Sequence, residues 1–169
     1  MHVDGRTIAL EIRSRKFGFA VFEGSDKLLD WGVRSFGEDV EGFESTLSDR
    51  IRTLLAFYGP AALVIRDREL NSTANGKRVR LIIRTIKLIM KSRATRFYAL
   101  TIKQVQDRFA PGGSTTKHDI AKSIAERFDE LSFKLPNKRK ACQSEAPAML
   151  VFDALTTAIA FLERGSAGN

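Results

Sequence analysis

The chain begins with three stretches in which apolar and polar residues follow the patterns of β-strands. They cover residues 6–13, 16–23 and 27–36, with a tight basic turn after the first and Gly24-Ser25-Asp26 before the third. Apolar runs and alternations of this length, bounded by turn residues, are typical of strands. Since such short connections join antiparallel neighbours, we expect a meander of three antiparallel strands.

Helical spacing follows the meander. Over residues 39–58 apolar side chains recur every three or four positions, acids crowd the first turns, and Gly59-Pro60 predicts the end of the helix. Residues 61–65 then form a short, continuous apolar run. A run of this kind is typical of a strand that is buried on both faces.

The remaining pattern predicts helices over residues 77–93 and 117–131, a fifth strand over residues 96–100, and a final helix that Pro147 can start. The expected order is therefore β-β-β-α-β-α-β-α-α. Three meander strands followed by two crossover units give a five-stranded mixed α/β sheet, with three antiparallel and two parallel strands and helices on both faces. We expect one domain over residues 1–164 and a short flexible tail over residues 165–169.

The net charge of the chain indicates what kind of partner it binds. The 169 residues carry a net charge of +8 and a sequence pI near 9.9, which favours an anionic partner, nucleic acid first and an acidic membrane second. A merely soluble basic surface is the alternative. The sequence shows neither a bilayer-length apolar run nor a signal peptide, and its single cysteine, Cys142, lacks disulfide or zinc partners. We therefore expect a cytoplasmic protein.

The positive charge is concentrated in one part of the chain. Between Leu70 and Gln106 there are nine cations and no acid, whereas a solvated helix face normally mixes the two signs. Contact with nucleic-acid phosphates explains such a stretch. The loop at Gly112-Gly113-Ser114 leads into a helix N-terminus. Such a loop either binds a phosphate or is an ordinary turn whose Ser or Thr caps the helix. The predicted nucleic-acid-binding residues are Arg13, Arg15, Lys16, Lys77, Arg78, Arg80, Arg84, Lys87, Lys91, Lys103 and Lys117.

One acid stands out from the first strand. Glu11 is the only acid between Asp4 and Glu23, and it lies on the strand face opposite Ile8, Leu10 and Ile12. A carboxylate at such a position is costly unless a cation or a hydrogen-bond network uses it. Glu11 is therefore the first candidate for a functional residue.

Four segments, in order along the chain, resemble motifs of the RuvC-type Holliday-junction resolvase family. Leu10–Phe19 resembles that family's opening strand and turn, and Phe152–Ala160 resembles its last helix. Between them, Ile102–Val105 and Gly112–Ile120 resemble a Val-Lys segment and a Gly-rich loop that ends in a lysine. The resemblance implies a ribonuclease H-like fold, and a fold alone does not determine a function.

The resemblance also implies a two-metal nuclease site, in which Mg²⁺ or Mn²⁺ is held by converging carboxylates. Glu11 falls at the family's first-strand Asp, and Asp153 at the second of two acidic positions on the last helix. The earlier helix position is occupied by Leu150, and Arg66 stands where the family has Glu at the end of the fourth strand. Glu11 and Asp153 are the predicted metal ligands.

Other acids could complete such a site. Asp67 and Glu69 are the candidate catalytic substitutes at the end of the fourth strand. Glu145 lies about 12 Å from Asp153 at helical rise, too far to share an ion unless the chain before Pro147 folds over. In the opposing interpretation, the Arg66 guanidinium pairs with Glu11 or Asp153 and neutralises the pocket without metal.

Two more expectations concern partners. Leu81 and Leu88 lie outside the main apolar stripe of their helix, so they either cover a flank of the core or form a homodimer seam, as in RuvC-type resolvases. Two-fold symmetry suits a four-way junction. The leading hypothesis is a metal-dependent endonuclease that resolves Holliday junctions or other branched DNA in recombination and repair. The alternatives are a non-catalytic nucleic-acid-binding module of the same fold and an RNA-processing factor of the superfamily.

Overall fold

A computed structural model describes residues 5–37, 42–68, 72–140 and 142–165. Its sheet has the strand order β3-β2-β1-β4-β5. The first three strands pair antiparallel, while β4 is parallel to β1 and β5 is parallel to β4. The expected five-stranded mixed sheet is therefore confirmed. The strand bounds are β1 (Arg6–Ile12), β2 (Lys16–Glu23), β3 (Lys27–Ser35), β4 (Ala62–Asp67) and β5 (Arg96–Thr101).

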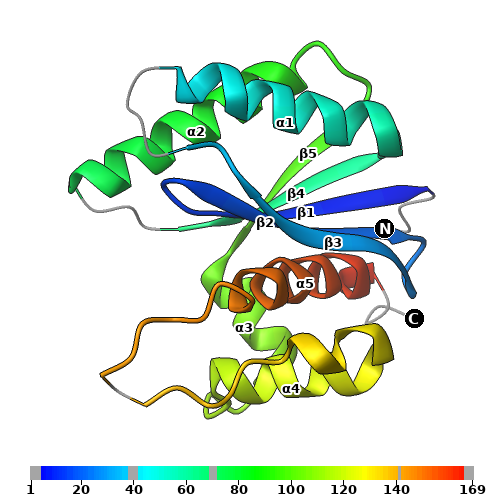
Figure 1. Ribbon diagram of the computed structural model, residues 1–169. Helices are drawn as coiled ribbons and strands as arrows, with labels where there is room; N and C mark the ends of the chain where they lie inside the picture. Colours follow the sequence, from blue (N-terminus) through cyan, green and yellow to red (C-terminus); the bar gives the residue numbers. More distant parts are fainter. Residues whose placement is uncertain (1–4, 38–41, 69–71, 141, 166–169) are drawn as a thin grey trace.

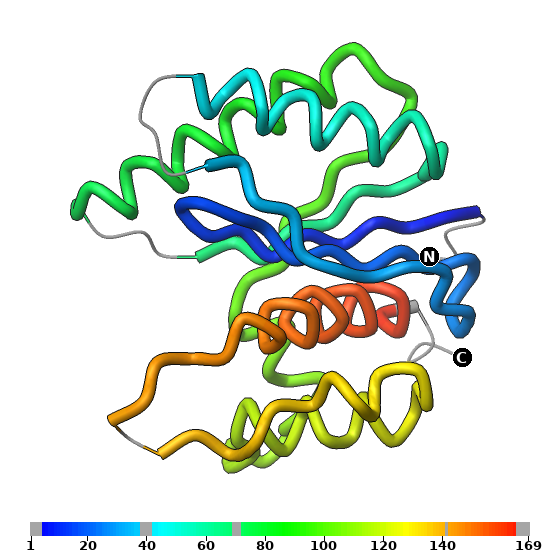
Figure 2. Tube along the Cα trace, in the orientation of Figure 1, coloured from blue at the N-terminus to red at the C-terminus, as the bar shows by residue number. Residues whose placement is uncertain are grey.

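Helices cover both faces of the sheet, as Figures 1 and 2 show. One face carries α1 (Phe43–Tyr58) and α2 (Ala74–Met90), and the other carries α5 (Met149–Leu162), against which α3 (Ile102–Phe109) and α4 (Lys117–Arg127) pack. Two 3-10 helices, η1 (Asp129–Lys134) and η2 (Glu163–Gly165), follow α4 and α5. Each face has its own apolar core. No helix in the described part of the chain has the length and apolar character needed to cross a membrane.

Several element boundaries differ from the expected ones, and one helix was not expected. The helix predicted at residues 77–93 begins earlier, because the Thr73 hydroxyl accepts a hydrogen bond from Gly76 and caps it. The unexpected α3 begins with a capping box formed by Thr101 and Gln104. The helix predicted to reach residue 131 ends at Arg127, since Phe128 is extended. Residues 39–41 of the first predicted helix and most of the expected tail lie outside the described residues.

The helix α5 is almost fully buried between the sheet and the outer helices. It approaches the sheet closely at Gly18, where an added Cβ would lie 2.8 Å from the Leu150 carbonyl carbon, inside van der Waals contact. Gly18 is also the antiparallel partner of Glu11. Gly18, whose lack of a side chain lets α5 pack closely on the sheet, therefore lies beside Glu11.

Replacing Gly18 by Ala is expected to lower the free energy of unfolding by at least about 2 kcal/mol, because backbone atoms of α5 would have to move. Denaturant unfolding of both proteins measures this loss. Gly112→Ala is the matched control, since a Cβ at Gly112 meets nothing within 4 Å. An unchanged stability of Gly18→Ala would contradict the close packing of α5 on β2.

Candidate functional site

The two predicted acids lie together beneath the surface. Glu11 is fully buried, and it lies on the sheet face that α5 covers, with Ala9 as its neighbour on that face. Asp153 is also buried, and α5 carries it to the same place. The two side chains share the guanidinium groups of Arg13 and Arg66 as partners. Their convergence, expected from the sequence, is confirmed.

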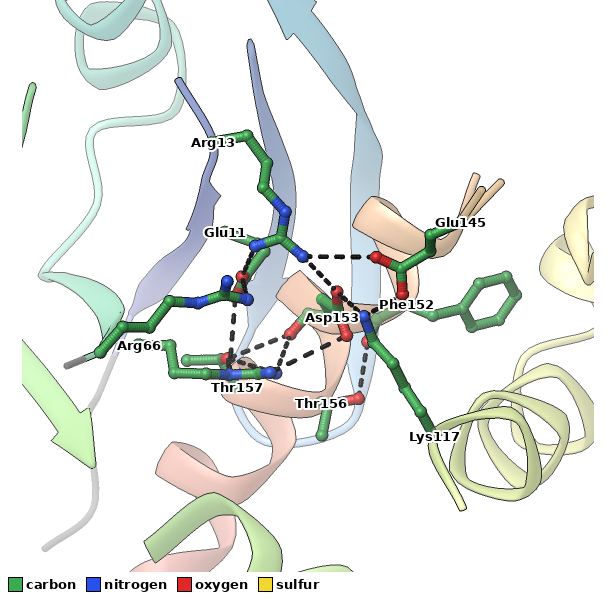
Figure 3. Close-up of polar contacts among 10 residues, drawn as sticks. Glu11, Arg13, Arg66, Lys117, Glu145, Phe152, Asp153, Thr156 and Thr157 are labelled. Carbon is green, nitrogen blue, oxygen red and sulfur yellow. Dashed lines mark hydrogen bonds and ion pairs between the residues drawn. The ribbon is translucent and has the colours of Figure 1, made fainter. Parts of the chain in front are cut away.

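Arg66 lies between the two acids and is nearly buried, with 13% of its side chain exposed. Its Nε is 3.5 Å from Glu11 Oε2, and its Nη1 is 3.8 Å from Asp153 Oδ1. It also donates hydrogen bonds to the Asp153 carbonyl at 2.9 Å and to Thr157 Oγ1 at 3.3 Å. Arg66 therefore ties the end of β4 to the middle of α5, as Figure 3 shows.

Three further cations surround the acids. Arg13 donates to Glu11 and, at 3.1 Å, to Asp153 Oδ2, while Arg68 donates to Glu11. Lys117, the first residue of α4, lies 2.6 Å from Asp153 Oδ2. Glu145 pairs with Lys117 and lies 3.6 Å from Arg13 Nη2. Among the described residues, four cations and three carboxylates thus form one network, named here the Glu11–Asp153 cluster; Figure 3 labels all of its members except Arg68.

Burial and charge act in opposite directions on these groups. Burial raises the pKa of Asp153, and the nearby Glu11 charge adds to this, while Lys117 and Arg66 oppose it. Burial also acts to raise the pKa of Glu145, but Lys117 and Arg13 outweigh it and hold that pKa below its usual range. Burial lowers the pKa of Arg68, Glu11 opposes this, and the charges of Arg13 and Arg66 reinforce it. The cluster therefore contains both attraction and crowding of like charges.

The cluster does not fit a two-metal site. Across the residues that the structure describes, no group of three or more His, Cys, Asp and Glu side chains is arranged to hold a metal ion. Cationic nitrogens occupy the space around the Glu11 and Asp153 oxygens that Mg²⁺ would need. The interpretation in which Arg66 neutralises the pocket is the one that this geometry supports.

Comparisons with known proteins agree with the fold. No family model matches the chain, and no curated protein matches its sequence. Among solved structures, Thermus thermophilus RuvC in complex with a Holliday-junction substrate matches with a TM-score of 0.73 and 15% identity, covering 96% of both chains. The yeast mitochondrial Holliday-junction resolvase Ydc2 matches with a TM-score of 0.70 and 15% identity, covering 96% of this chain and 79% of its own.

The chain has the RuvC-type fold. A third structure, the fowlpox virus resolvase with Holliday-junction DNA, matches with a TM-score of 0.57 and 14% identity, over 93% of this chain and 98% of that one. Ydc2 and the fowlpox virus protein are described as resolvases, and the RuvC and fowlpox virus structures are described as complexes with a Holliday junction. At these identities the likeness establishes the ribonuclease H-like architecture and leaves the chemistry to the residues of this chain.

Within this RuvC-type fold, the other acids considered from the sequence lie at different positions relative to the cluster. Asp67 is exposed and lines a depression together with Arg68, Thr101 and Lys103. Glu69 lies outside the described residues. Glu145, which helical spacing had placed out of reach, does join the cluster, because residues 142–146 are not helical and fold back over it.

The predicted nucleic-acid-binding cations fall into two groups, those with described contacts inside the protein and those on its surface. Arg13 and Lys117 belong to the cluster, Lys103 pairs with Asp107, and Arg78 lies over the Phe43 ring and bonds the Gly37 carbonyl. Exposed cations on or just after α2 are Lys77, Arg80, Arg84, Lys87 and Lys91, while Arg15 and Lys16 lie in the first hairpin turn.

Sequence reasoning missed Arg68 as a member of the cluster. The signal was present, because residues two apart in an extended segment point to the same face, so Arg68 follows Arg66 toward Glu11. Thr157 was also missed, although it lies one helical turn after Asp153 and accepts from Arg66.

Replacing Arg66 by Met is expected to lower the free energy of unfolding at neutral pH by about 1–3 kcal/mol, because it removes the nearly buried cation between Glu11 and Asp153 and the donor to the Asp153 carbonyl. The loss should shrink as the pH falls. Asp153, whose pKa burial raises, takes up a proton in the folded state before it does so in the unfolded chain, which relieves the penalty in acid.

Denaturant unfolding at neutral and acidic pH measures both effects. Arg52→Met, at an exposed position on α1, is the control and should change stability little. A small loss at Arg66 that does not depend on pH would argue against its role as the buried counter-charge.

Proposed function

We propose that this chain binds branched DNA, four-way junctions first, and does not cleave it by metal-dependent hydrolysis. The observation that carries the proposal is Arg66 between Glu11 and Asp153, at the place where the resemblance to RuvC-type resolvases calls for a third carboxylate. The DNA part of the proposal is supported by the RuvC-type fold and by the acid-free basic stretch. Compared with the leading sequence hypothesis, the proposal keeps branched DNA as the partner and omits its cleavage.

The position of Arg66 makes displacement by a metal ion costly. Its guanidinium would have to leave two carboxylates, a backbone carbonyl and the Thr157 hydroxyl, all in a nearly buried position. Among the described residues the cluster has four positive and three negative groups, so a divalent cation would add charge of the wrong sign. The local charge therefore favours an anion over a metal.

The DNA-binding surface is proposed to include α2. Five cations on or just after this helix are exposed, and the sequence from Leu70 to Gln106 contains no acid. Thermus thermophilus RuvC and the fowlpox virus resolvase, whose folds this chain shares, are described in complexes with Holliday junctions. A four-way DNA junction is accordingly the first ligand to test for binding, with branched RNA as the comparison.

A metal-dependent endonuclease is the second candidate, and Glu145 favours it. Its carboxylate reaches Arg13 and Lys117, the same two cations that contact Asp153, so three acids surround these groups. Rotation of Arg13 and Lys117 away from the cluster would open Asp153 and Glu145 to Mg²⁺ or Mn²⁺.

Incubation of the protein with a synthetic four-way junction and Mg²⁺ or Mn²⁺ separates the two candidates. We expect the junction to be bound without metal-dependent cleavage, because the acids are already neutralised. Gel electrophoresis under native and denaturing conditions reads binding and cleavage, with an active RuvC-type resolvase as the positive control.

Glu11→Gln and Asp153→Asn are the informative variants for this assay. Metal-dependent product in the wild type that both substitutions abolish would overturn the non-catalytic proposal. Product that neither substitution affects would point to a contaminating nuclease. Absence of junction binding at low salt would remove the DNA part of the proposal.

We also propose a homodimer through α2. Leu81 and Leu88 are 36% and 55% exposed, so they do not complete the core as one sequence interpretation had it. They are seven residues apart on one helix, a spacing that returns side chains to nearly the same face. Pairing of this face with its two-fold copy would cover both leucines.

Replacing both Leu81 and Leu88 by Asp is expected to convert a dimer into a monomer, because it places charge in the proposed interface. Sedimentation equilibrium measures the mass of wild type and variant. Phe133→Asp is the matched control, since Phe133 is 73% exposed and follows α4 on the opposite side of the sheet. A monomeric wild type would rule out the homodimer.

A further inference from the structure

The Glu11–Asp153 cluster is layered by charge. The Glu11 and Asp153 side chains are 0% and 3% exposed, whereas those of Arg13, Arg68 and Lys117 are 26%, 29% and 43% exposed. The two acids therefore lie at the bottom, and the cations lie between them and solvent. A polyanion that approaches this site meets guanidinium and ammonium groups before Glu11 and Asp153. The third carboxylate of the cluster, Glu145, is 36% exposed and pairs with Lys117 and Arg13 in this outer layer.

Depressions in the surface border the cluster. Arg66, Lys117 and Asp153 line a depression of about 320 Å³ that extends along α3. Arg68 lines another of about 450 Å³ together with Lys103 and Asp67. Cations of the cluster thus border both depressions, and an extended strand could contact them through its backbone.

The buried acids hold the cations in place. Glu11 receives hydrogen bonds from Arg13 and Arg68, and Asp153 contacts Arg13 and Lys117. Side chains that are already fixed lose less conformational freedom on binding, so they bind an anion more tightly than mobile ones. Lys117 also begins α4, whose N-terminal dipole adds to the positive potential there.

We propose that this cluster binds a backbone phosphate of the DNA directly, through Arg13, Arg68 and Lys117 and without a metal ion. Glu11 and Asp153 act as positioning residues that orient these cations. Guanidinium groups suit phosphate oxygens because they can donate two parallel hydrogen bonds. This inference rests on the proposed DNA-binding function and assigns one phosphate contact of that interaction to the buried-acid site.

The alternative role for the cations is structural neutralisation of Glu11 and Asp153 with no DNA contact. The two roles differ in salt dependence, since each phosphate contact contributes about −0.9 to the slope of log K against log salt concentration on duplex DNA. A structural role changes the stability of the protein and leaves that slope unaltered.

The test measures four-way-junction affinity between about 50 and 200 mM salt, in buffer with EDTA, for wild type, Arg68→Gln and Lys117→Gln. Each variant is expected to bind severalfold more weakly at low salt and to have a slope shallower by about 0.9. Lys27→Gln makes the same change of charge at the other end of the sheet, where Lys27 pairs with Glu23, and should leave the slope unchanged.

Loss of Arg68 also removes a partner of Glu11, so the double variant Arg68→Gln with Glu11→Gln separates folding from binding. It should regain the thermal stability lost by Arg68→Gln and keep the shallow slope. A double variant with the slope of the wild type would overturn the phosphate contact.

The remaining outcomes are also distinguishable. A wild type that binds the junction, with equal slopes in all variants, overturns this inference and leaves the proposed function intact. A wild type that does not bind overturns both. Thermal stabilisation by inorganic phosphate that Arg68→Gln and Lys117→Gln abolish, without a change of slope, would assign the site to free phosphate and overturn the DNA contact.

Discussion

The buried carboxylate of Glu11 is the constraint on which the rest of the site depends. A charge at that depth has to be compensated. The fold brings Arg13 against it from the turn after β1, Arg66 from the end of β4, and Arg68 from just beyond β4. Metal ions would balance such acids with mobile, exchangeable charge. Covalently attached cations do so permanently, and they are the basis of the proposal that this site binds DNA without hydrolysing it.

The fold contributes by holding two layers close together. Gly18 lets α5 approach the sheet beside Glu11, and the nearly continuous burial of α5 fixes Asp153 over it. Because these features are also those of a RuvC-type nuclease scaffold, architecture alone would have suggested catalysis. The cations around the two acids are the reason why binding without cleavage is proposed instead.

Much of this could be predicted from the sequence. Strand patterns gave β1 to β5 nearly to the residue, since alternation and short apolar runs report burial directly. The helix α3 was missed because it is short and mostly exposed, although its Thr101–Gln104 capping box was visible. The convergence of Glu11 and Asp153 followed from the family resemblance.

The remainder of the site depended on geometry that linear spacing does not contain. Glu145 was placed out of reach by counting helical rise through a segment that is not helical. Arg68 was overlooked because it follows the strand, yet it keeps the orientation of Arg66. Irregular segments next to regular elements decide such contacts, and their course is set by packing rather than by periodicity.

The hydrogen bonds of Arg66 to the Asp153 carbonyl and the Thr157 hydroxyl have an evolutionary consequence. An exchange of Arg66 for Glu, the residue that the family resemblance calls for, would bring a third acid against Glu11 and Asp153 and remove the bonds that join β4 to α5. As long as the other cations remained, the protein with Glu at position 66 would have neither a metal site nor the hydrogen bonds that join β4 to α5. We therefore expect the metal-binding and cation-filled forms of this site to be separated by a less stable sequence, so that one cannot be reached from the other by a single exchange without loss of stability.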